Sequence, residues 1–416
     1  MGHPEALPSV ARDRAGTVRL VVILGGLAAF APLSFDMYLP AFPELATDFG
    51  ASASAIQLTL TSCLVGVAVG QLVFGSLSDA RGRRGPLLVG LVVYTVASAL
   101  CALAPDAPTL AGLRFVQGFA AGAAVVASRA VVRDLHSGTA AARFFSSLML
   151  VNGLAPVLAP SIGSAVLEVT TWEGIFLVLA TTGVLLVGAV ALGLPETLPR
   201  ERRREAGLRR VLAGFGEPLS DRWFVGHALA LGLAVSGVFA YIAGSSFVLQ
   251  DVYGASPQLY GVLFGLNAVF LVAGAQVNAH LLATRSPRSL LRVGLLMLVV
   301  AGVALVVIVS LPKAELETVM APLMLQMASW SFVQANALAL ALTDHPEVAG
   351  TAAALLGVSQ YAFGAFTAPL VGLGGSDTAL PMALVIAACA VGAAVAFESL
   401  ASRSPVPQVT GVHPET

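Results

Sequence analysis

The chain has 416 residues, of which 57% are hydrophobic and only 11% are charged, and its formal net charge is −1. Soluble proteins carry about 25% charged residues, so this chain lacks the polar side chains that would cover a water-facing surface. The near-neutral charge gives no basic footprint for nucleic acid, and the three scattered cysteines give neither metal-ligand spacing nor a disulfide framework. The single lysine, Lys313, follows a proline, which excludes the Gly-Lys-Ser/Thr phosphate loop of an ATP-driven pump. The composition predicts a multi-pass membrane protein that takes its energy from another source.

Twelve apolar stretches are long enough to cross a bilayer, since a spanning helix needs roughly 20 apolar residues. Internal prolines such as Pro32 and Pro322 do not exclude helices, because neighbouring helices can satisfy the freed backbone groups. The first stretch has some features of a signal peptide, but its apolar run continues past any Ala-x-Ala-like site, so we interpret it as a span. The predicted spans lie near 19–42, 54–76, 86–104, 109–131, 141–166, 173–194, 223–249, 257–283, 289–311, 318–342, 347–372 and 378–400.

Arginines gather in every second connection between these stretches. RGRR at 81–84 follows the second span and RERRREAGLRR at 200–210 follows the sixth, whereas the alternate connections hold Lys313 and several acids. This asymmetry satisfies the positive-inside rule if both termini are cytoplasmic. We therefore expect an all-α integral protein of the cell inner or plasma membrane, with twelve helices and cytoplasmic N- and C-termini.

The two halves of the chain show weak internal similarity. VFGSLSDARGRRGPLLVG at 73–90 aligns with VNAHLLATRSPRSLLRVG at 277–294, an offset of 204 residues, and the same offset aligns FGAS at 49–52 with YGAS at 253–256. Such duplicated six-helix halves place the substrate site between them near the membrane midplane. The predicted organisation is a tail at 1–18, a six-helix half at 19–199, a linker at 200–222, a second half at 223–401 and a tail at 402–416.

The halves differ in their charged residues, which predicts that coupling chemistry resides in the first. At the same offset, uncharged residues stand opposite the charged ones: Ala240 against Asp36, Ala283 against Asp79 and Thr318 against Arg114.

Several motifs resemble those of the major facilitator superfamily. GSLSDARGRRGPLL at 75–88 resembles its loop 2–3 signature, G-x-L-x-D-R-x-G-R-R/K, with Ala80 in place of the first arginine. LAGLRFVQGFAAG at 110–122 resembles the helix-four signature, and APSIGS at 159–164 is a softened form of the helix-five antiporter signature G-P-x-x-G-G. LPETL at 194–198 ends span six as in this family, and DMYLPAFP at 36–43, together with VRDL at 132–135, is similar to the bicyclomycin- and chloramphenicol-resistance exporters. The resemblance implies the twelve-helix major facilitator fold and a drug:proton antiporter powered by the proton gradient, with no cofactor.

Asp36 and Arg114 are the clearest ionisable residues inside predicted spans, where a charge is costly and marks a functional site. Each lies about 10 Å along its helix from the same membrane face, so we expect opposite charges at matching depth. Burial favours a neutral carboxyl and a nearby arginine favours a carboxylate, so small rearrangements would change the protonation of Asp36. In the resembling exporters this pair takes part in proton and drug coupling. The alternative is a permanent structural ion pair. Arg129, near the cytoplasmic end of the fourth span, stays unexplained.

The loop 2–3 signature predicts a conformational latch. Asp79 can accept hydrogen bonds from a neighbouring helix N-terminus, and Arg83 and Arg84 can pair with an acid such as Asp134. The alternative is that this loop only sets topology, although that would not require Asp79 or the flanking glycines. The latch residues are Gly75, Asp79, Gly82, Arg83, Arg84 and Asp134.

Span five carries Asn152, Pro156, Pro160 and Gly163 near one helix face. Proline removes backbone hydrogen bonds and bends a helix, so these residues predict a rigid kinked wall beside the cavity, unless they serve only close packing. By contrast, we assign the Gly-x-x-x-Gly pairs at 66–70 and 118–122 to helix packing.

A polar and aromatic stripe on span ten suits uncharged amphipathic compounds, which bind by stacking and hydrogen bonding. Interhelical hydrogen bonding is the alternative. The predicted substrate-binding residues are Phe35, Tyr38, Tyr241, Asn267, Gln326, Trp330, Gln334 and Tyr361.

Together these features predict a proton-coupled exporter of drug-like, neutral amphipathic compounds that works by alternating access. We expect a monomer whose partners are its small-molecule substrate, protons and the bilayer, with no nucleic acid. A metabolite exporter or a proton-coupled uptake transporter on the same fold is the alternative. A polytopic membrane enzyme is disfavoured, because no catalytic set of His, Asp, Glu or Ser lies within the spans.

Overall fold

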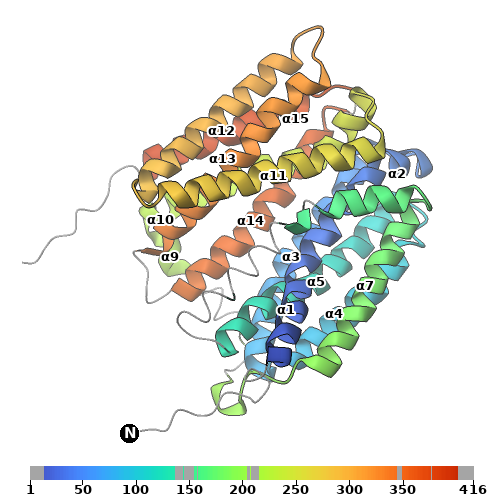
Figure 1. The fold of residues 1–416 in the computed structure, drawn as a ribbon, viewed down its shortest axis with the longest axis vertical. Helices are drawn as coiled ribbons and strands as arrows, with labels where there is room; N and C mark the ends of the chain where they lie inside the picture. The colour runs from blue at the N-terminus through green and yellow to red at the C-terminus, as the bar shows by residue number, and fades with distance from the viewer. Residues whose placement is uncertain are drawn as a thin grey trace, which may run out of the picture.

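The computed structural model describes residues 14–135, 144, 154–156, 158–203, 207, 215–343, 349–375 and 377–401. These residues are helical apart from short connections, and the helices form two groups that correspond to the two halves of the chain (Figure 1). The first group comprises α1 (Arg14–Asp36), α2 (Phe42–Asp48), α3 (Ala53–Arg81), α4 (Arg84–Cys101), α5 (Ala107–Leu135) and α7 (Trp172–Gly193). The second comprises α9 (Gly216–Ser220), α10 (Arg222–Phe247), α11 (Pro257–Leu281), α12 (Pro287–Val309), α13 (Leu316–Thr343), α14 (Ala349–Gly372) and α15 (Leu380–Leu400). Short 3-10 or π turns lie at Leu39–Ala41, Arg200–Arg202 and Val248–Val252.

Ten helices in the described part of the chain are long and apolar enough to cross a membrane, and each falls on one predicted stretch. The helix α13, 28 residues long, lies where the tenth span is predicted but is not among these ten. A shorter apolar helix over Leu154–Leu167 covers part of the predicted fifth span, and the rest of that span lies outside the described residues. The prediction of an all-helical membrane protein is confirmed.

The outer helices expose large apolar side chains that a soluble protein would bury. Leu192 on α7 is 90% exposed, and Leu185, Val300 and Val395 are exposed on α7, α12 and α15. Side chains of this kind suit lipid contact, because hydrocarbon is as apolar as they are. The surface therefore agrees with the composition.

The loops that the 204-residue offset aligns have the same conformation. Gly50 and Gly254 both have a positive φ, of 56° and 69°, which glycine adopts without steric cost. Two residues later, Ser52 and Ser256 accept hydrogen bonds from the first turns of α3 and α11, so each serves as a helix N-cap. The same residue types thus begin the second membrane-spanning helix of each half.

The bundle has two ends, which we name by landmarks. The α2 end holds α2 and residues Leu39–Ala41, and the linker end holds the connection between α3 and α4 together with Arg200–Arg202. The hydrogen bonds that join described residues of the two halves lie at the α2 end, where α3 also packs against α14 (Figure 1). They link Gln57 to Ala243, Ser246 to Leu39, Gln250 to Pro40, Ser164 to Pro257 and Ser161 to Gly261.

The helices α3 and α5 approach each other backbone to backbone. A Cβ on Gly66 or Gly70 would overlap the backbone of Phe119 or its neighbours on α5, and a Cβ on Gly118 would overlap the backbone of Cys63 on α3. Gly122 faces the Gly70 backbone in the same way, at 2.7 Å. This is the close packing that small-xxx-small spacing permits.

Candidate functional site

Arg114 lies on α5, and its side chain is fully buried in the first half of the protein, where α5 packs against α1. Its Nη2 donates a 2.8 Å hydrogen bond to the carbonyl oxygen of Ser34, and its Nη1 donates to the side-chain carbonyl of Gln117. The guanidinium also lies 4.2 Å from the ring centroid of Tyr38, a favourable cation–π arrangement. Ser34 is in the last turn of α1, where carbonyls lack a helical partner, so Arg114 satisfies this carbonyl.

A polar network extends from Arg114 toward α4. Gln117 donates to the Ser98 hydroxyl at 2.7 Å, and the Ser34 hydroxyl lies 2.5 Å from the Tyr94 hydroxyl. Because each of these neutral groups is buried and hydrogen-bonded, the network holds the arginine in a fixed position. The sequence did not indicate Ser34, Tyr94 or Ser98, since each is a common helical residue on its own.

Asp36, two residues after Ser34, faces the other half of the protein. It is 4% exposed, and its Oδ1 is buried without a hydrogen-bond partner in the described part of the chain. It interacts electrostatically with Tyr241, Tyr260 and Tyr361, all in the second half. The expected matching depth is supported, because Arg114 bonds to Ser34, but no ion pair joins Arg114 to Asp36 among the described residues. The permanent ion pair considered from the sequence is therefore not formed.

Three aromatic rings connect the two halves, and one of them, Phe35, directly precedes Asp36 in the chain. The ring centroid of Phe35 lies 6.0 Å from that of Tyr361 on α14, and Tyr361 lies 6.5 Å from Phe239 on α10. Edge-tilted contacts at these separations are favourable between aromatic rings. Asp36 thus follows, in α1, the residue through which the first half contacts these rings.

The other proposed substrate residues occupy different places. Tyr38 packs against Arg114 and bonds to Thr59 within the first half. Tyr241 stacks on Phe264 and accepts a 3.0 Å hydrogen bond from Asn267, so these two residues of the second half lie together.

The stripe on α13 does not act as one unit. Gln326 is buried and donates to the Gly237 carbonyl on α10 at 2.8 Å, the interhelical bonding that was the alternative for this stripe. Trp330 is buried and Gln334 is exposed.

On the fifth span, Gly163 packs against the backbone of Met37, and a Cβ there would overlap the Met37 carbonyl. Pro160 is buried, whereas Pro156 is half-buried. Asn152 lies outside the described residues.

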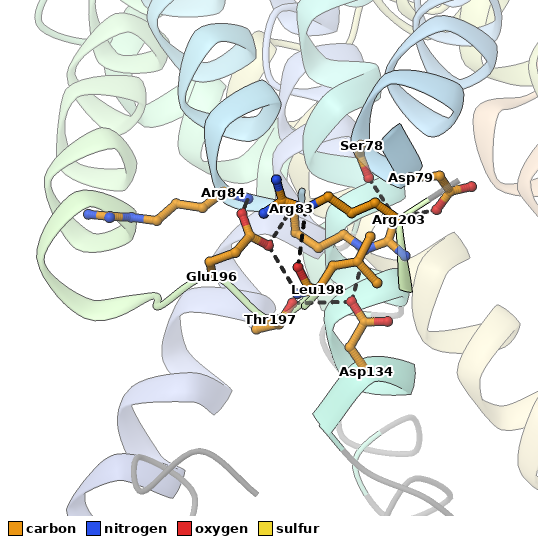
Figure 2. A network of polar contacts seen from close by, with 9 residues as sticks. All are labelled: Ser78, Asp79, Arg83, Arg84, Asp134, Glu196, Thr197, Leu198 and Arg203. Carbon is orange, nitrogen blue, oxygen red and sulfur yellow. Dashed lines mark hydrogen bonds and ion pairs between the residues drawn. The ribbon is translucent and has the colours of Figure 1, made fainter. Parts of the chain in front are cut away.

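The loop between α3 and α4 forms a dense ion-pair network at the linker end (Figure 2). Arg83 pairs with Asp134 at 2.8 Å and with Asp79 at 2.5 Å, and it also donates to Ser78. Burial lowers the pKa of Arg83, but its hydrogen bonds to Asp134 and Asp79 outweigh this effect and raise the pKa above its ordinary value. Arg83 therefore stays charged, and it links the connection between α3 and α4 to both α3 and α5.

Arg84 differs from its predicted role. It does not pair with Asp134; its Nη2 donates instead to the Ala191 carbonyl at the end of α7, at 2.5 Å. Gly75 has open space around it. The predicted pairing is thus found for Arg83 and not for Arg84.

Glu196, which the sequence did not single out, completes this network. Its carboxylate accepts from the backbone N–H groups of Arg83 at 2.7 Å, Arg84 at 3.3 Å and Leu198 at 3.0 Å (Figure 2). Gly82 permits this approach, because its φ is +98° and a Cβ would overlap the Glu196 carboxylate. LPETL at 194–198 was the only signal for this residue.

The sequence profile described as Major Facilitator Superfamily matches residues 24–369. The chain belongs to the Major Facilitator Superfamily. It is accordingly a multi-pass membrane transporter and not an enzyme.

Individual superfamily members agree with this assignment over most of the chain. The uncharacterized MFS-type transporter YdgK of Bacillus subtilis is 41% identical over 383 residues, covering 92% of this chain and 95% of YdgK. A bicyclomycin resistance protein homolog of Haemophilus influenzae is 32% identical over 392 residues, covering 93% of this chain and 97% of that protein. The resemblance to bicyclomycin-resistance proteins is thereby confirmed.

Among solved structures, the partially occluded, inward-open xylose transporter XylE from E. coli superposes with a TM-score of 0.73 at 13% identity. The alignment covers 95% of this chain and 98% of XylE. At this identity the likeness concerns the fold alone. It shows that the helices of this superfamily member have the same overall arrangement.

Proposed function

We propose that this superfamily transporter is a proton-coupled exporter of drug-like, mostly neutral amphipathic compounds, and that it works by alternating access. Drug resistance in the name of the Haemophilus relative supports the substrate class. With cytoplasmic termini, as the arginine distribution indicates, the linker end faces the cytoplasm. The hydrogen bonds at the α2 end then close the outer side, as expected for a carrier waiting for substrate from within.

The observation that carries the proposal is the position of Asp36. Its carboxyl is buried, has an unpartnered oxygen in the described structure and interacts electrostatically with Tyr241 and Tyr361 of the second half. An unpaired charge inside a bilayer is costly, so the carboxyl is stabilised by protonation or by a partner that arrives during the cycle. If a proton and the substrate bind at this position in turn, the transport of one is coupled to the transport of the other.

Arg114 has a supporting role in this scheme. Since it is fixed by Ser34, Gln117 and Tyr38, its positive charge stays in place while Asp36 changes state. The direction of the cycle is then outward: proton entry at Asp36 from the outer side releases the compound, and proton loss to the cytoplasm resets the site.

The test is a resistance screen over a drug panel in an efflux-deficient host, comparing the wild type with Asp36→Asn. We expect the wild type to confer resistance to at least one compound and Asp36→Asn to lose it, while the variant remains in the membrane at equal amount. Asp106→Asn is the matched control, because Asp106 is exposed and caps α5 through Thr109, which an asparagine can also do. Full resistance with Asp36→Asn would contradict the coupling assignment.

A flux measurement separates export from uptake. In everted vesicles with an acidic interior, the active compound added outside should raise the internal pH if it exchanges for protons. An uptake symporter would give no such exchange. This measurement therefore also distinguishes the proposal from its main alternative on the same fold.

A further inference from the structure

Arg129 is a charged residue that the proposed coupling scheme does not use. It lies on α5, fifteen residues beyond Arg114 and so about 22 Å further toward the linker end. Its side chain is exposed, and the described part of the chain gives it neither a hydrogen bond nor an ion pair. By contrast, Arg83 between α3 and α4 pairs with two carboxylates.

The end of the Arg129 side chain points at the second half of the protein. The position that a Cβ would take on Gly357 of α14 lies 3.7 Å from Nη1 of Arg129 and 4.0 Å from Oε1 of Gln71. Three helices, α5, α3 and α14, therefore converge at a place where α14 has no side chain. The Gln71 Nε2 is buried there without a hydrogen-bond partner among the described residues.

Tyr361 connects this place to Asp36. It lies on α14, one turn beyond Gly357, and it interacts electrostatically with both Arg129 and Asp36. Side chains tilt toward the N-terminus of their helix, and α5 and α14 run in opposite directions between the two ends. Arg129 is thus directed toward the α2 end and Tyr361 toward the linker end, so that they approach each other.

The aromatic cluster therefore interacts with two residues of opposite charge. Tyr361, the middle ring of the cluster of Phe35, Tyr361 and Phe239, interacts electrostatically with the acid Asp36 and with the guanidinium of Arg129. The guanidinium has five N–H donors and suits planar or tetrahedral oxyanions, while the unpartnered amide of Gln71 adds a further donor. A neutral ligand would leave these donors unused.

We propose that Arg129 and Gln71 bind the anionic group of an amphipathic organic anion, such as a carboxylate or sulfonate, whose planar apolar part lies along Phe35, Tyr361 and Phe239. This inference rests on the proposed function, because it names the substrate class of the same site. It extends the transported class from neutral compounds to aromatic acids.

The test uses two fluorescent probes that differ by one anionic group: anilinonaphthalene sulfonate and phenylnaphthylamine, the same skeleton without the sulfonate. Saturable binding of each is measured with purified protein in nanodiscs, after subtraction of protein-free nanodiscs. We expect Arg129→Gln to weaken sulfonate binding by about tenfold, as for a lost hydrogen bond to a charged group. The neutral probe should bind as before.

Two further variants complete the design. Arg129→Lys keeps the charge but loses the planar fork, and should retain part of the preference for the sulfonate. Arg133→Gln removes an equal exposed charge one turn further along α5, and should leave both probes unaffected. If Arg129→Gln weakens both probes equally, or neither, the anion subsite is refuted.

The outcome is independent of proton coupling. Binding in nanodiscs needs no gradient, so a probe preference that depends on Arg129 would stand even if Asp36→Asn left resistance intact. Conversely, loss of resistance with Asp36→Asn and no effect of Arg129→Gln on sulfonate binding would support the exporter and refute only the anion subsite.

Discussion

The Arg114 guanidinium donates a 2.8 Å hydrogen bond to the carbonyl oxygen of Ser34, in the last turn of α1. A backbone carbonyl cannot be titrated, so the contact persists whatever the protonation state of Asp36. The arginine is therefore a fixed positive charge within the first half. The acid, two residues further along, is free of it and faces the second half.

Arg114→Lys should destabilise the protein although it conserves the charge. A lysine ammonium cannot bond to Ser34 and Gln117 while lying flat on Tyr38, because these contacts need a planar fork. We expect a loss of about 1–3 kcal/mol, seen as a lower melting temperature in detergent. Arg133→Lys, at an exposed site on the same helix, should melt like the wild type. Equal melting of both variants would mean that only the charge of Arg114 matters.

Asp79→Ala and Asp134→Ala should differ in their effects, although both remove an acid from Arg83. The Asp79 side chain is 53% exposed and that of Asp134 only 15%. Removing Asp79 should cost less than about 1 kcal/mol, whereas removing Asp134 leaves the buried arginine poorly compensated and should cost about 3 kcal/mol. Melting temperatures of the two variants test this order.

Transport rates add a second readout for Asp79. If the loop is a latch that forms and breaks during the cycle, Asp79→Ala should slow turnover more than it weakens substrate binding. An unchanged turnover rate would leave the network with a purely structural role.

Gly82→Ala should disturb the same loop through the backbone. Gly82 has a φ of +98°, which is strained for alanine, and an added methyl would overlap the Glu196 carboxylate. We expect a cost of about 1–3 kcal/mol and reduced transport. Gly85→Ala, three residues further and with nothing within 4 Å of its Cβ position, should be neutral. Comparable losses of stability in the two variants would contradict the assignment of the cost to the positive φ of Gly82 and its contact with Glu196.

A disulfide at the α2 end should stop transport. The Cβ position of Gly372 lies 2.9 Å from the Cβ of Ser54 and 2.6 Å from its Cα. A disulfide needs a Cβ–Cβ distance of about 3.8 Å, so the bond requires the two helix backbones to separate slightly at this point. Oxidised Ser54→Cys/Gly372→Cys should hold α3 to α14 and prevent the outer side from opening. Reduction should restore transport, and each single variant should be insensitive to oxidant. Transport by the cross-linked protein would show that these helices need not separate.

The sequence predicts the fold well because its strongest signals, apolar length and arginine placement, are properties of the chain itself. It also places Asp36 and Arg114 at one depth, since rise per residue is constant in a helix. What it could not predict are the partners of these charges. Arg114 bonds to a backbone carbonyl, and since every residue has one, the sequence does not indicate which carbonyl is the acceptor. Glu196 accepts from N–H groups that lie more than a hundred residues away in the chain.

The same limit applies to the substrate residues. The spacing of polar and aromatic residues on α13 predicted one substrate-binding stripe. In the structure, Gln326 donates a hydrogen bond to α10 and Gln334 is exposed. Small rotations of a helix within the bundle decide such outcomes, and they depend on packing against several neighbours at once. For Arg129 the sequence indicated no role, because the residues that suggest one, Gly357 and Gln71, lie on other helices and come next to it only in the folded structure.

The glycine contact between α3 and α5 limits which substitutions this transporter can accept. Even a methyl group at Gly66 or Gly118 would push the two backbones apart, so those positions should reject almost every substitution although no ligand touches them. Phe239 on α10 and Tyr361 on α14 differ from these glycines, because they approach each other through side chains and not through backbone. Changes in substrate specificity should therefore arise at side-chain positions and not at these glycines, so that the α3–α5 contact that positions Arg114 and Arg129 is kept.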